Sequence, residues 1–367
     1  PGAGDGLTGG SEILDENLDG SGCQMNEKRW RKEPGARVEG FRDLDRSKVQ
    51  APGIARDPSG GFRLFYTGVG PGRPFPTCQG YILSAVSDDG LSFRPEPGIR
   101  LAPQPGVPHM GLRTLSPTVA PCEEGCWRMY FESRGPASLP TVICSAISTD
   151  MLHWKHEDGI RLQGFDGLGG PRYVVLPDGR ARLFCCAEER GPDGERSKSV
   201  VSAVTSDGIH FELEPGYRKR DRQSENDAVG ITAADVIAPV VAGDRWTMVY
   251  SAWQDVPPGT VVPIHPSEDR DSVSGGPIED FAAASIASDL AGYRSRIFVA
   301  HSHDGLVWGP GECAIEGGGH ESDDLDAVHA EDMSLMRIAD GGYRMYYAAC
   351  DRDGNWRIAS AVRKEGD

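Results

Sequence analysis

The chain has 367 residues, with 38 Lys or Arg against 55 Asp or Glu, so its net charge is −17. This acidic balance argues against nucleic acid and anionic membranes as partners, and the apolar runs are too short to span a membrane. A hydrophobic content of 38% is typical of a globular protein with a sizeable core.

Residues 1–36 are rich in Gly and acidic residues, and we expect them to form a tail or a strap over the rest of the chain. Asp15, Asn17 and Asp19 have the spacing of the first half of a calcium loop, but Asn26 stands where that loop needs a bidentate Glu. A solvated acidic tail is therefore the favoured interpretation. The segment has neither the basic start nor the apolar core of a secretory signal.

Nine cysteines are spread along the chain, too sparsely for a small disulfide-stapled scaffold. Their dispersal favours reduced thiols and a cytoplasmic location, with secretion as the alternative. Cys122 and Cys126 flank a short turn and have the spacing to bridge a hairpin or to bind a metal. No second pair of cysteines completes a metal site, so the sequence identifies no bound metal.

Three sequence patterns recur five times in a fixed order. The first is a short apolar segment, found at 51–54, 116–119, 170–173, 235–238 and 332–335. Eleven residues later a second pattern alternates bulky and polar residues, as in FRLFY at 62–66 and YRMYY at 343–347. The third is SAVSDDGLSF at 84–93, which returns at 145–154, 202–211, 299–308 and, shortened, at 360–366.

This repetition predicts an all-β fold, a five-bladed β-propeller of four-stranded antiparallel blades over residues 37–367. Alternating residues indicate half-buried strands, and the Asp-Gly pairs indicate hairpin turns. We expect the Asp of each turn to accept hydrogen bonds from nearby backbone N–H groups, and the following aromatic residue to pack between blades. The last blade ends one strand short, and residues 37–41 are the candidate to complete it.

The copies of the third pattern begin 61, 57, 97 and 61 residues apart. The long interval reflects an insertion at about 254–295, between the second and third strands of the fourth blade. Long loops in compact domains are usually functional or disordered. A lid over one mouth of the propeller and a merely mobile insertion are both consistent with this segment.

The first strand of each propeller blade lines the central channel, so side chains from distant sequence positions converge there. Cations of the second and third blades and carboxylates of the fourth and fifth predict a polar site for a hydroxyl-rich or anionic ligand. The candidate catalytic residues are Asp235, Glu331 and Asp332. The candidate substrate-binding residues are His109, Arg113, Arg172, Glu188, Trp253 and His329. Glu132 and Glu188 have arginines nearby, which favours plain ion pairs for them.

Two segments carry a family resemblance. ADV…DRWTMVYS at 234–251 and AEDMSL…GYRMYY at 330–347 resemble blades of the arabinanases and β-xylosidases, which belong to a wider five-bladed group with levansucrases, invertases and mannoside phosphorylases. The resemblance covers about residues 45–365. It implies glycoside hydrolase-like chemistry on a small-molecule or oligosaccharide ligand.

In this group two carboxyl groups flank the glycosidic bond, one as proton donor and one as base or nucleophile. Asp235 resembles a family Asp, and Glu331 resembles the donor Glu loosely. The early-blade acids of the family are not matched, because Ala51, Thr118 and the Gly170-Pro-Arg segment stand in their places. The resemblance implies no cofactor except a possible structural Ca²⁺ or other cation in the channel, which His320 or His329 would assist.

Three functions are therefore considered. The first is a glycosidase-like hydrolase that uses the channel carboxylates. The second is a propeller enzyme repurposed for non-hydrolytic chemistry on a small metabolite, as in natural-product biosynthesis, and the unmatched early acids favour it. The third is a noncatalytic sugar-binding propeller.

Overall fold

The structure is a computed structural model, and it describes residues 1, 30–46, 48–69, 79–122, 125–136, 138–192, 194, 196–223, 230–239, 244–255, 293–319, 322–339 and 341–364. Most of the expected N-terminal tail, most of the insertion and His320 lie outside these residues. Within them the fold is all-β, apart from the short 3-10 helix η2 (Pro108–Met110).

The strands pair in successive antiparallel groups of four, each of which we call a unit. The first unit contains β2 (Lys48–Arg56), β3 (Phe62–Val69), β4 (Gly80–Ser87) and β5 (Arg94–Pro95). The second contains β6 (Arg113–Pro121), β7 (Trp127–Arg134), β8 (Val142–Ser148) and β9 (Lys155–His156). The third contains β10 (Gly167–Val175), β11 (Ala181–Arg190), β12 (Arg196–Thr205) and β13 (Glu212–Leu213).

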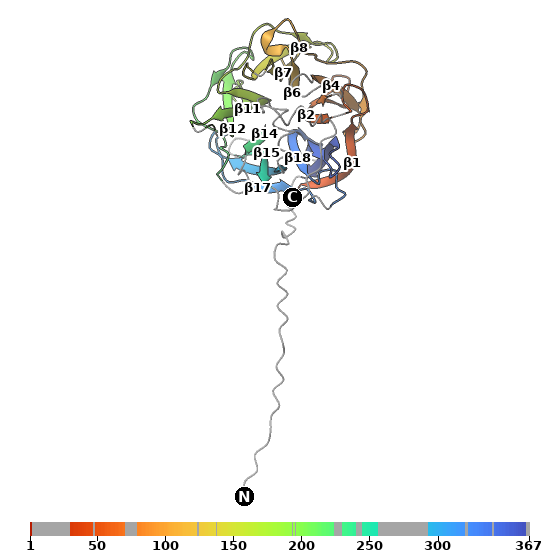
Figure 1. The fold of residues 1–367 in the computed structure, drawn as a ribbon, viewed down its shortest axis with the longest axis vertical. Coiled ribbons are helices and arrows are strands. Elements are labelled where there is room, and N and C mark those ends of the chain that lie inside the picture. Colours follow the sequence, from red (N-terminus) through yellow and green to blue (C-terminus); the bar gives the residue numbers. More distant parts are fainter. Residues whose placement is uncertain are drawn as a thin grey trace.

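The fourth unit contains β14 (Gly230–Ile237), β15 (Trp246–Asp255), β16 (Tyr293–Ser302) and β17 (Glu312–Ile315). The last contains β18 (His329–Arg337), β19 (Tyr343–Cys350), β20 (Trp356–Arg363) and, from the other end of the chain, β1 (Arg31–Glu39). Figure 1 shows the units around a common centre, with β2, β6, β14 and β18 nearest to it.

The hydrophobic core is divided between neighbouring units, because each sheet buries its faces against the next. Leu183 of the third unit packs with Tyr130 of the second, and Ala330 of the last unit packs with Val249 of the fourth. A further cluster joins the first unit to the last, through Leu64 and Tyr346. The clusters therefore follow the same circular order as the sheets.

A repeated polar contact shows why β1 completes the last unit. In the first three units a Glu near the fourth strand accepts hydrogen bonds from an Arg of the second strand and a Ser of the third. The three groups are Glu96–Arg63–Ser84, Glu157–Arg128–Ser145 and Glu214–Arg182–Ser202. Glu33 of β1 makes the same contacts with Arg344 and Ser360, at 2.8 and 2.7 Å. The closing strand expected at residues 37–41 is thus β1, which begins earlier, at Arg31.

The turns after the third strands have the predicted chemistry. Asp89, Asp150, Asp207 and Asp304 each accept two backbone N–H groups with one carboxylate oxygen, at 2.8–2.9 Å. Because these bonds stabilise the charged form, together with a His153 or His210 contact in two of the turns, the pKa of each Asp lies below its usual value. The aromatic residue that follows packs on a neighbouring unit, as Phe93 does on Tyr346 with ring centroids 5.6 Å apart.

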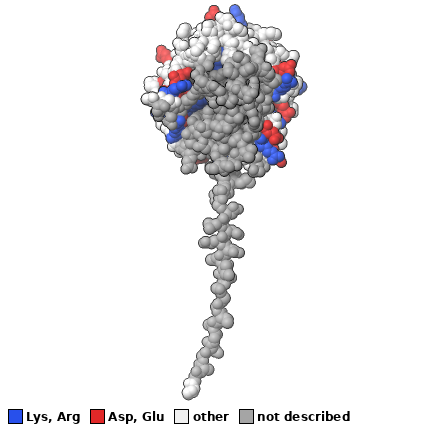
Figure 2. Space-filling view, in the orientation of Figure 1, with Lys and Arg blue, Asp and Glu red and all other residues white. Residues whose placement is uncertain are grey.

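Other described features bear on the early expectations. Cys122 and Cys126 form no disulfide with each other. No helix in the described part of the chain is long and apolar enough to cross a membrane. On the face shown in Figure 2, described Lys and Arg side chains lie beside Asp and Glu side chains around the rim.

Candidate functional site

Each first strand is interrupted by a β-bulge in its pairing with the second strand. In four of these bulges one residue has a left-handed backbone, namely Ala51, Ser116, Gly170 and Asp332, with φ between 49° and 57°. The short apolar pattern of the sequence marks these four bulges. Asp332 is the acidic residue among them, and Asp tolerates this conformation better than most residues.

Arg172 follows the bulge of β10 and joins four first strands. Its guanidinium donates hydrogen bonds to the carbonyls of Pro52, Pro117, Pro171 and Met333, at 2.9–3.5 Å. The side chain is buried, with 3% of its surface exposed. These carbonyls belong to β2, β6, β10 and β18, so Arg172 acts as a polar tie at the centre of the ring.

The family resemblance allowed a structural cation in the channel, and the position of Arg172 bears on whether one could bind there. Carbonyl oxygens that converge on one point are typical ligands of a hard cation. Here they converge on a guanidinium, whose positive charge would repel a metal ion at the same place. Among the described residues no group of three or more His, Cys, Asp and Glu side chains is arranged to hold a metal either. A channel cation therefore does not fit beside Arg172.

Asp235 lies past the bulge of β14, and its carboxylate accepts backbone N–H groups. The donors are Val236 and, across to β18, Leu335, both at 2.8 Å. Burial raises the pKa of Asp235, while the Arg172 charge opposes the rise. The equal eleven-residue spacing suggested that Asp235 corresponds to Ala51. In the register, however, Asp235 pairs with Val249 as Gly53 pairs with Phe65, and the bulge of β14 lies earlier, between Ile231 and Ala233.

Glu331 and Asp332 lie together at the bulge of β18, where 4% and 5% of their surfaces are exposed. The indole Nε1 of Trp253 donates to Glu331 Oε2 at 3.3 Å, and the Asp332 backbone N–H donates to Ser251 Oγ at 3.4 Å. Burial, followed by the adjacent Glu331 charge, raises the pKa of Asp332 to about 8. Lys48 and Arg172 oppose this rise, and Glu132 adds to it. The carboxyl of Asp332 is therefore harder to ionise than that of an ordinary Asp.

Glu132 supplies a further buried carboxylate from β7. It accepts Arg134 Nε at 2.9 Å and the Gly170 backbone N–H at 3.1 Å, and it is fully buried. The ion pair expected for Glu132 is confirmed. Its charge also reaches Asp332, which local sequence did not indicate.

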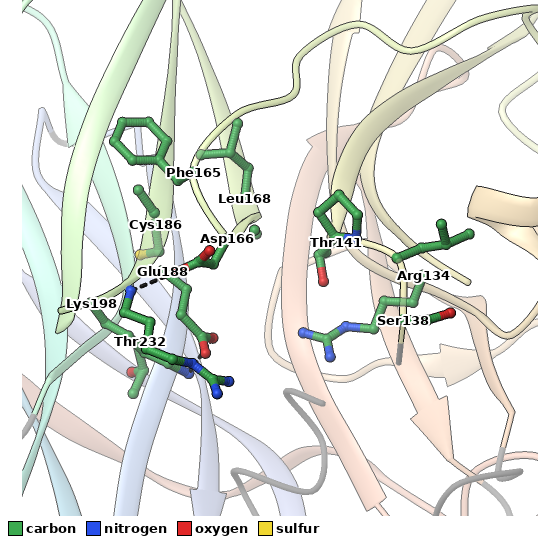
Figure 3. Close-up of a pocket in the computed structure, with 16 residues that line it drawn as sticks. Arg134, Ser138, Thr141, Phe165, Asp166, Leu168, Cys186, Glu188, Lys198 and Thr232 are labelled. Carbon is green, nitrogen blue, oxygen red and sulfur yellow. Dashed lines mark hydrogen bonds and ion pairs between the residues drawn. The ribbon is translucent and has the colours of Figure 1, made fainter. Parts of the chain in front are cut away.

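A cavity of about 460 Å³ opens beside these groups, between the second and third units. Figure 3 shows Arg134, Ser138 and Thr141 on one side, and Phe165, Leu168, Cys186, Glu188 and Lys198 on the other. Thr232 also lines the cavity, and its hydroxyl lies 2.5 Å from Ser251 Oγ, the same atom that accepts the Asp332 N–H. The cavity wall is thus two hydrogen bonds from Asp332.

The remaining predicted residues are divided between this region and others. Glu188 lines the cavity, and Trp253 contacts Glu331. His329 is buried against Trp356, with the rings stacked 5.3 Å apart, and its Nδ1 accepts the Ser295 N–H. Arg113 is fully buried at the start of β6, and His109 is half-buried in η2.

Sequence reasoning missed Lys198 and Phe165. The Lys198 ammonium lies 3.7 Å from Glu188 Oε2 and 4.7 Å from the centre of the Trp253 ring. Burial lowers its pKa, which the Glu188 charge opposes. Neither residue belongs to a repeated pattern. For Lys198 the available signal was a cation shortly before the apolar run of a third strand, in SKSVVSAV at 197–204.

No protein-family model and no curated protein matches the sequence. Among solved structures, BT0996 in its RGII complex has a TM-score of 0.63 at 16% identity, with the match covering 93% of this protein and 94% of BT0996. A thermostable family-43 glycoside hydrolase has a TM-score of 0.62 at 13% identity, with coverages of 92% and 96%. The endo-arabinase of Bacteroides thetaiotaomicron has a TM-score of 0.56 at 12% identity, with the match covering 91% of this protein and 98% of the arabinase. The protein thus shares the fold of the propeller glycoside hydrolases, as its sequence resemblance implied.

Proposed function

We propose that the chain is a five-bladed β-propeller, each unit being one blade, and that it is a carbohydrate-active enzyme of glycoside hydrolase-like chemistry. Its ligand is a small-molecule or oligosaccharide glycoside bound beside the bulge of β18. The observation that carries this proposal is the buried pair of Glu331 and Asp332, since Asp332 lies two hydrogen bonds from the cavity wall. The likeness to glycoside hydrolase folds supports it at the level of architecture.

In the proposed mechanism the two neighbouring carboxyl groups have different roles. Asp332 keeps its proton at neutral pH, so it is the general acid that protonates the leaving oxygen of the glycosidic bond. Glu331, oriented by the Trp253 N–H, is the carboxylate that activates water or attacks the sugar. Burial of the pair strengthens the electrostatic interactions with the charge that develops on the sugar.

Asp235 has a supporting role in this proposal. Its carboxylate accepts one N–H from its own strand and one from β18, and so couples the fourth and last units. Arg172 holds the neighbouring strands through their carbonyls. Both residues therefore position the strand that carries Glu331 and Asp332, and neither transfers a proton.

The test is hydrolysis of a panel of 4-nitrophenyl glycosides, covering α-arabinofuranoside, β-xyloside and β-mannoside, by wild type and variants. Asp332→Asn and Glu331→Gln should each lower kcat at least 100-fold. Asp326→Asn is the matched control, because Asp326 lies just before β18 and is similarly buried but binds Lys32 and Tyr347. Full activity of Asp332→Asn on a substrate that wild type cleaves would refute the assignment.

One observation favours the second candidate function, non-hydrolytic chemistry or sugar binding without turnover. The bulge residues that correspond to Asp332 are Ala51, Ser116 and Gly170, so Asp332 is the acid among these four. A wild-type protein that binds these glycosides and cleaves none of them would favour this alternative.

A further inference from the structure

The residue directly after the alternating pattern of each second strand occupies a fixed place in the repeat. For Thr67, Glu132 and Ser251, the side chain at this place accepts a backbone N–H from the next unit around the ring. In each case the donor is a bulge residue with a left-handed backbone. This place therefore joins the second strand of one unit to the first strand of the next. In chain order its residues are Thr67, Glu132, Cys186, Ser251 and Ala348.

Each of these contacts satisfies a backbone group that the bulge displaces from regular strand pairing. The donors have φ between 51° and 57°, and they lie within the register shifts between first and second strands. A buried N–H without an acceptor costs free energy, and a side chain across the unit boundary supplies the acceptor. The pairs are Thr67 with Ser116 at 3.0 Å, Glu132 with Gly170 at 3.1 Å and Ser251 with Asp332 at 3.4 Å.

Ser251 differs from Thr67 and Glu132 because its donor is Asp332, the proposed general acid. Asp332 has φ +51°, a conformation that costs a non-glycine residue free energy and persists where the surroundings hold it. The place of a side chain follows from its backbone, so the group that holds this φ also fixes the Asp332 carboxyl. Ser251 Oγ, from the fourth unit, is such a group.

A second hydroxyl holds Ser251 itself. Thr232 Oγ1 lies 2.5 Å from Ser251 Oγ and 3.4 Å from the Ser251 carbonyl oxygen. A serine hydroxyl has one proton and two acceptor sites, so Ser251 Oγ can bond Thr232 and accept the Asp332 N–H at the same time. Ser251 is fully buried, and Thr232 is 3% exposed where it lines the cavity (Figure 3). Thr232, Ser251 and Asp332 thus form one buried hydrogen-bonded chain.

We propose that Ser251 is a positioning residue for Asp332, and that its hydroxyl holds the left-handed bulge of β18 so that the Asp332 carboxyl stays where it donates its proton. This inference rests on the proposed function for the role of Asp332, and adds the residue of the fourth unit on which that role depends. Ser251 acts through the Asp332 backbone and takes no part in proton transfer.

The test compares kcat and KM of Ser251→Ala with those of wild type, on the 4-nitrophenyl glycoside that wild type cleaves fastest. Loss of the acceptor lets the bulge relax, and a displacement of about 1 Å at a reacting group lowers a rate by roughly 100-fold. We expect kcat to fall by about 10-fold or more while KM stays within about twofold, because Ser251 does not contact the ligand. Ser251→Thr keeps the hydroxyl and should recover most of the wild-type kcat, since Thr67 accepts the corresponding bond.

Thr67→Ala is the matched control. It removes the same kind of bond to the bulge of another unit, where Ser116 stands in the place of Asp332. Both Ala variants should lower the unfolding temperature, but Thr67→Ala should leave kcat close to the wild-type value. An unchanged kcat in Ser251→Ala would overturn the proposal. An equal fall in kcat in Thr67→Ala would do the same, because the effect would then follow from lost stability alone.

Amide hydrogen exchange tests the contact without turnover. The Asp332 N–H should exchange faster in Ser251→Ala and stay protected in Thr67→Ala, and the Ser116 N–H should show the reverse. Unchanged exchange of the Asp332 N–H in Ser251→Ala would mean that Ser251 does not hold the bulge, and the proposal would fail.

The two proposals fail in different ways. If Asp332→Asn loses hydrolysis while Ser251→Ala keeps its kcat, the positioning role fails and the acid assignment stands. If Asp332→Asn keeps full activity, the acid assignment fails, and the carboxyl of Asp332 then decides the positioning role. Burial raises the pKa of Asp332, so a carboxyl released from its place should titrate at lower pH in Ser251→Ala than in wild type. An unchanged titration would overturn the positioning role as well.

Discussion

The carboxylate of Glu132 lies where a side chain at Gly169 would begin. A Cβ added to Gly169 would stand 2.5 Å from Glu132 Oε2, closer than two such atoms can approach. The two residues come from neighbouring units, Gly169 from β10 and Glu132 from β7. The absence of a side chain at residue 169 therefore allows β7 to place a carboxylate within electrostatic reach of Asp332.

Gly169→Ala should therefore destabilise the protein by about 1–3 kcal/mol, because a methyl group collides with a buried, hydrogen-bonded carboxylate. Urea unfolding measures this cost. Gly106→Ala is the control, since a Cβ at Gly106 meets no atom within 4 Å, and it should be near neutral. Adding Glu132→Ala to Gly169→Ala should cost less than the two single changes summed. Strict additivity would contradict the contact.

Asp332 predicts a particular pH dependence of stability. Between the usual pKa of an Asp and about 8, the folded state holds a proton at Asp332 that the unfolded state has released. Stability must then fall as the pH rises through this interval. Asp332→Asn removes this contribution, so the difference in unfolding free energy between variant and wild type should grow in favour of the variant from pH 5 to pH 8. A difference that does not change with pH would rule out the raised pKa.

Arg172→Met should lower the free energy of unfolding by about 3 kcal/mol or more. The change leaves four carbonyls from four strands without their shared donor in a buried place. Arg180→Met is the control, because the Arg180 side chain is about half exposed and pairs locally with Asp178. It should stay within about 0.5 kcal/mol of wild type. Equal costs for the two variants would mean that the hydrogen bonds from Arg172 to the four carbonyls contribute nothing to stability.

Glu33→Ala tests the closure of the ring by β1. Loss of the contacts to Arg344 and Ser360 should cost about 1–3 kcal/mol, close to the cost of Glu214→Ala, which makes the same contacts inside the third unit. Glu39→Ala, whose side chain is 66% exposed, serves as the control in the same denaturation experiment. If Glu33→Ala resembled the control and Glu214→Ala did not, β1 would not act as the fourth strand of the last unit.

Much of the fold could be predicted because its signals are local. Strands alternate, and each Asp turn is completed within a few residues, so Asp89 or Asp207 can be assigned its role from sequence alone. One local signal went unused. Glu-Pro-Gly-x-Arg at 33–37 recurs at 96–100 and 214–218, and as Glu-Asp-Gly-x-Arg at 157–161. It identifies the fourth strands, and would have placed the start of β1 correctly.

The site could be predicted only in part, because its contacts are between units. Glu331 and Asp332 could be named as candidates because the repeat marks the bulge on β18, where they lie. The position of Asp235 relative to the bulges could not be predicted, because equal spacing does not fix the register of a strand, and its bond to Leu335 crosses to another unit. The Lys198–Trp253 contact likewise joins the third and fourth units, and no sequence interval reports it.

The most direct measurement is the carboxyl ¹³C chemical shift of Asp332 as a function of pH, assigned by its absence in Asp332→Asn. Asp332 should be protonated at pH 7 and titrate near 8, and Glu331→Gln should shift its titration to lower pH. A carboxyl that is already ionised at pH 5 would contradict Asp332 as the proton donor.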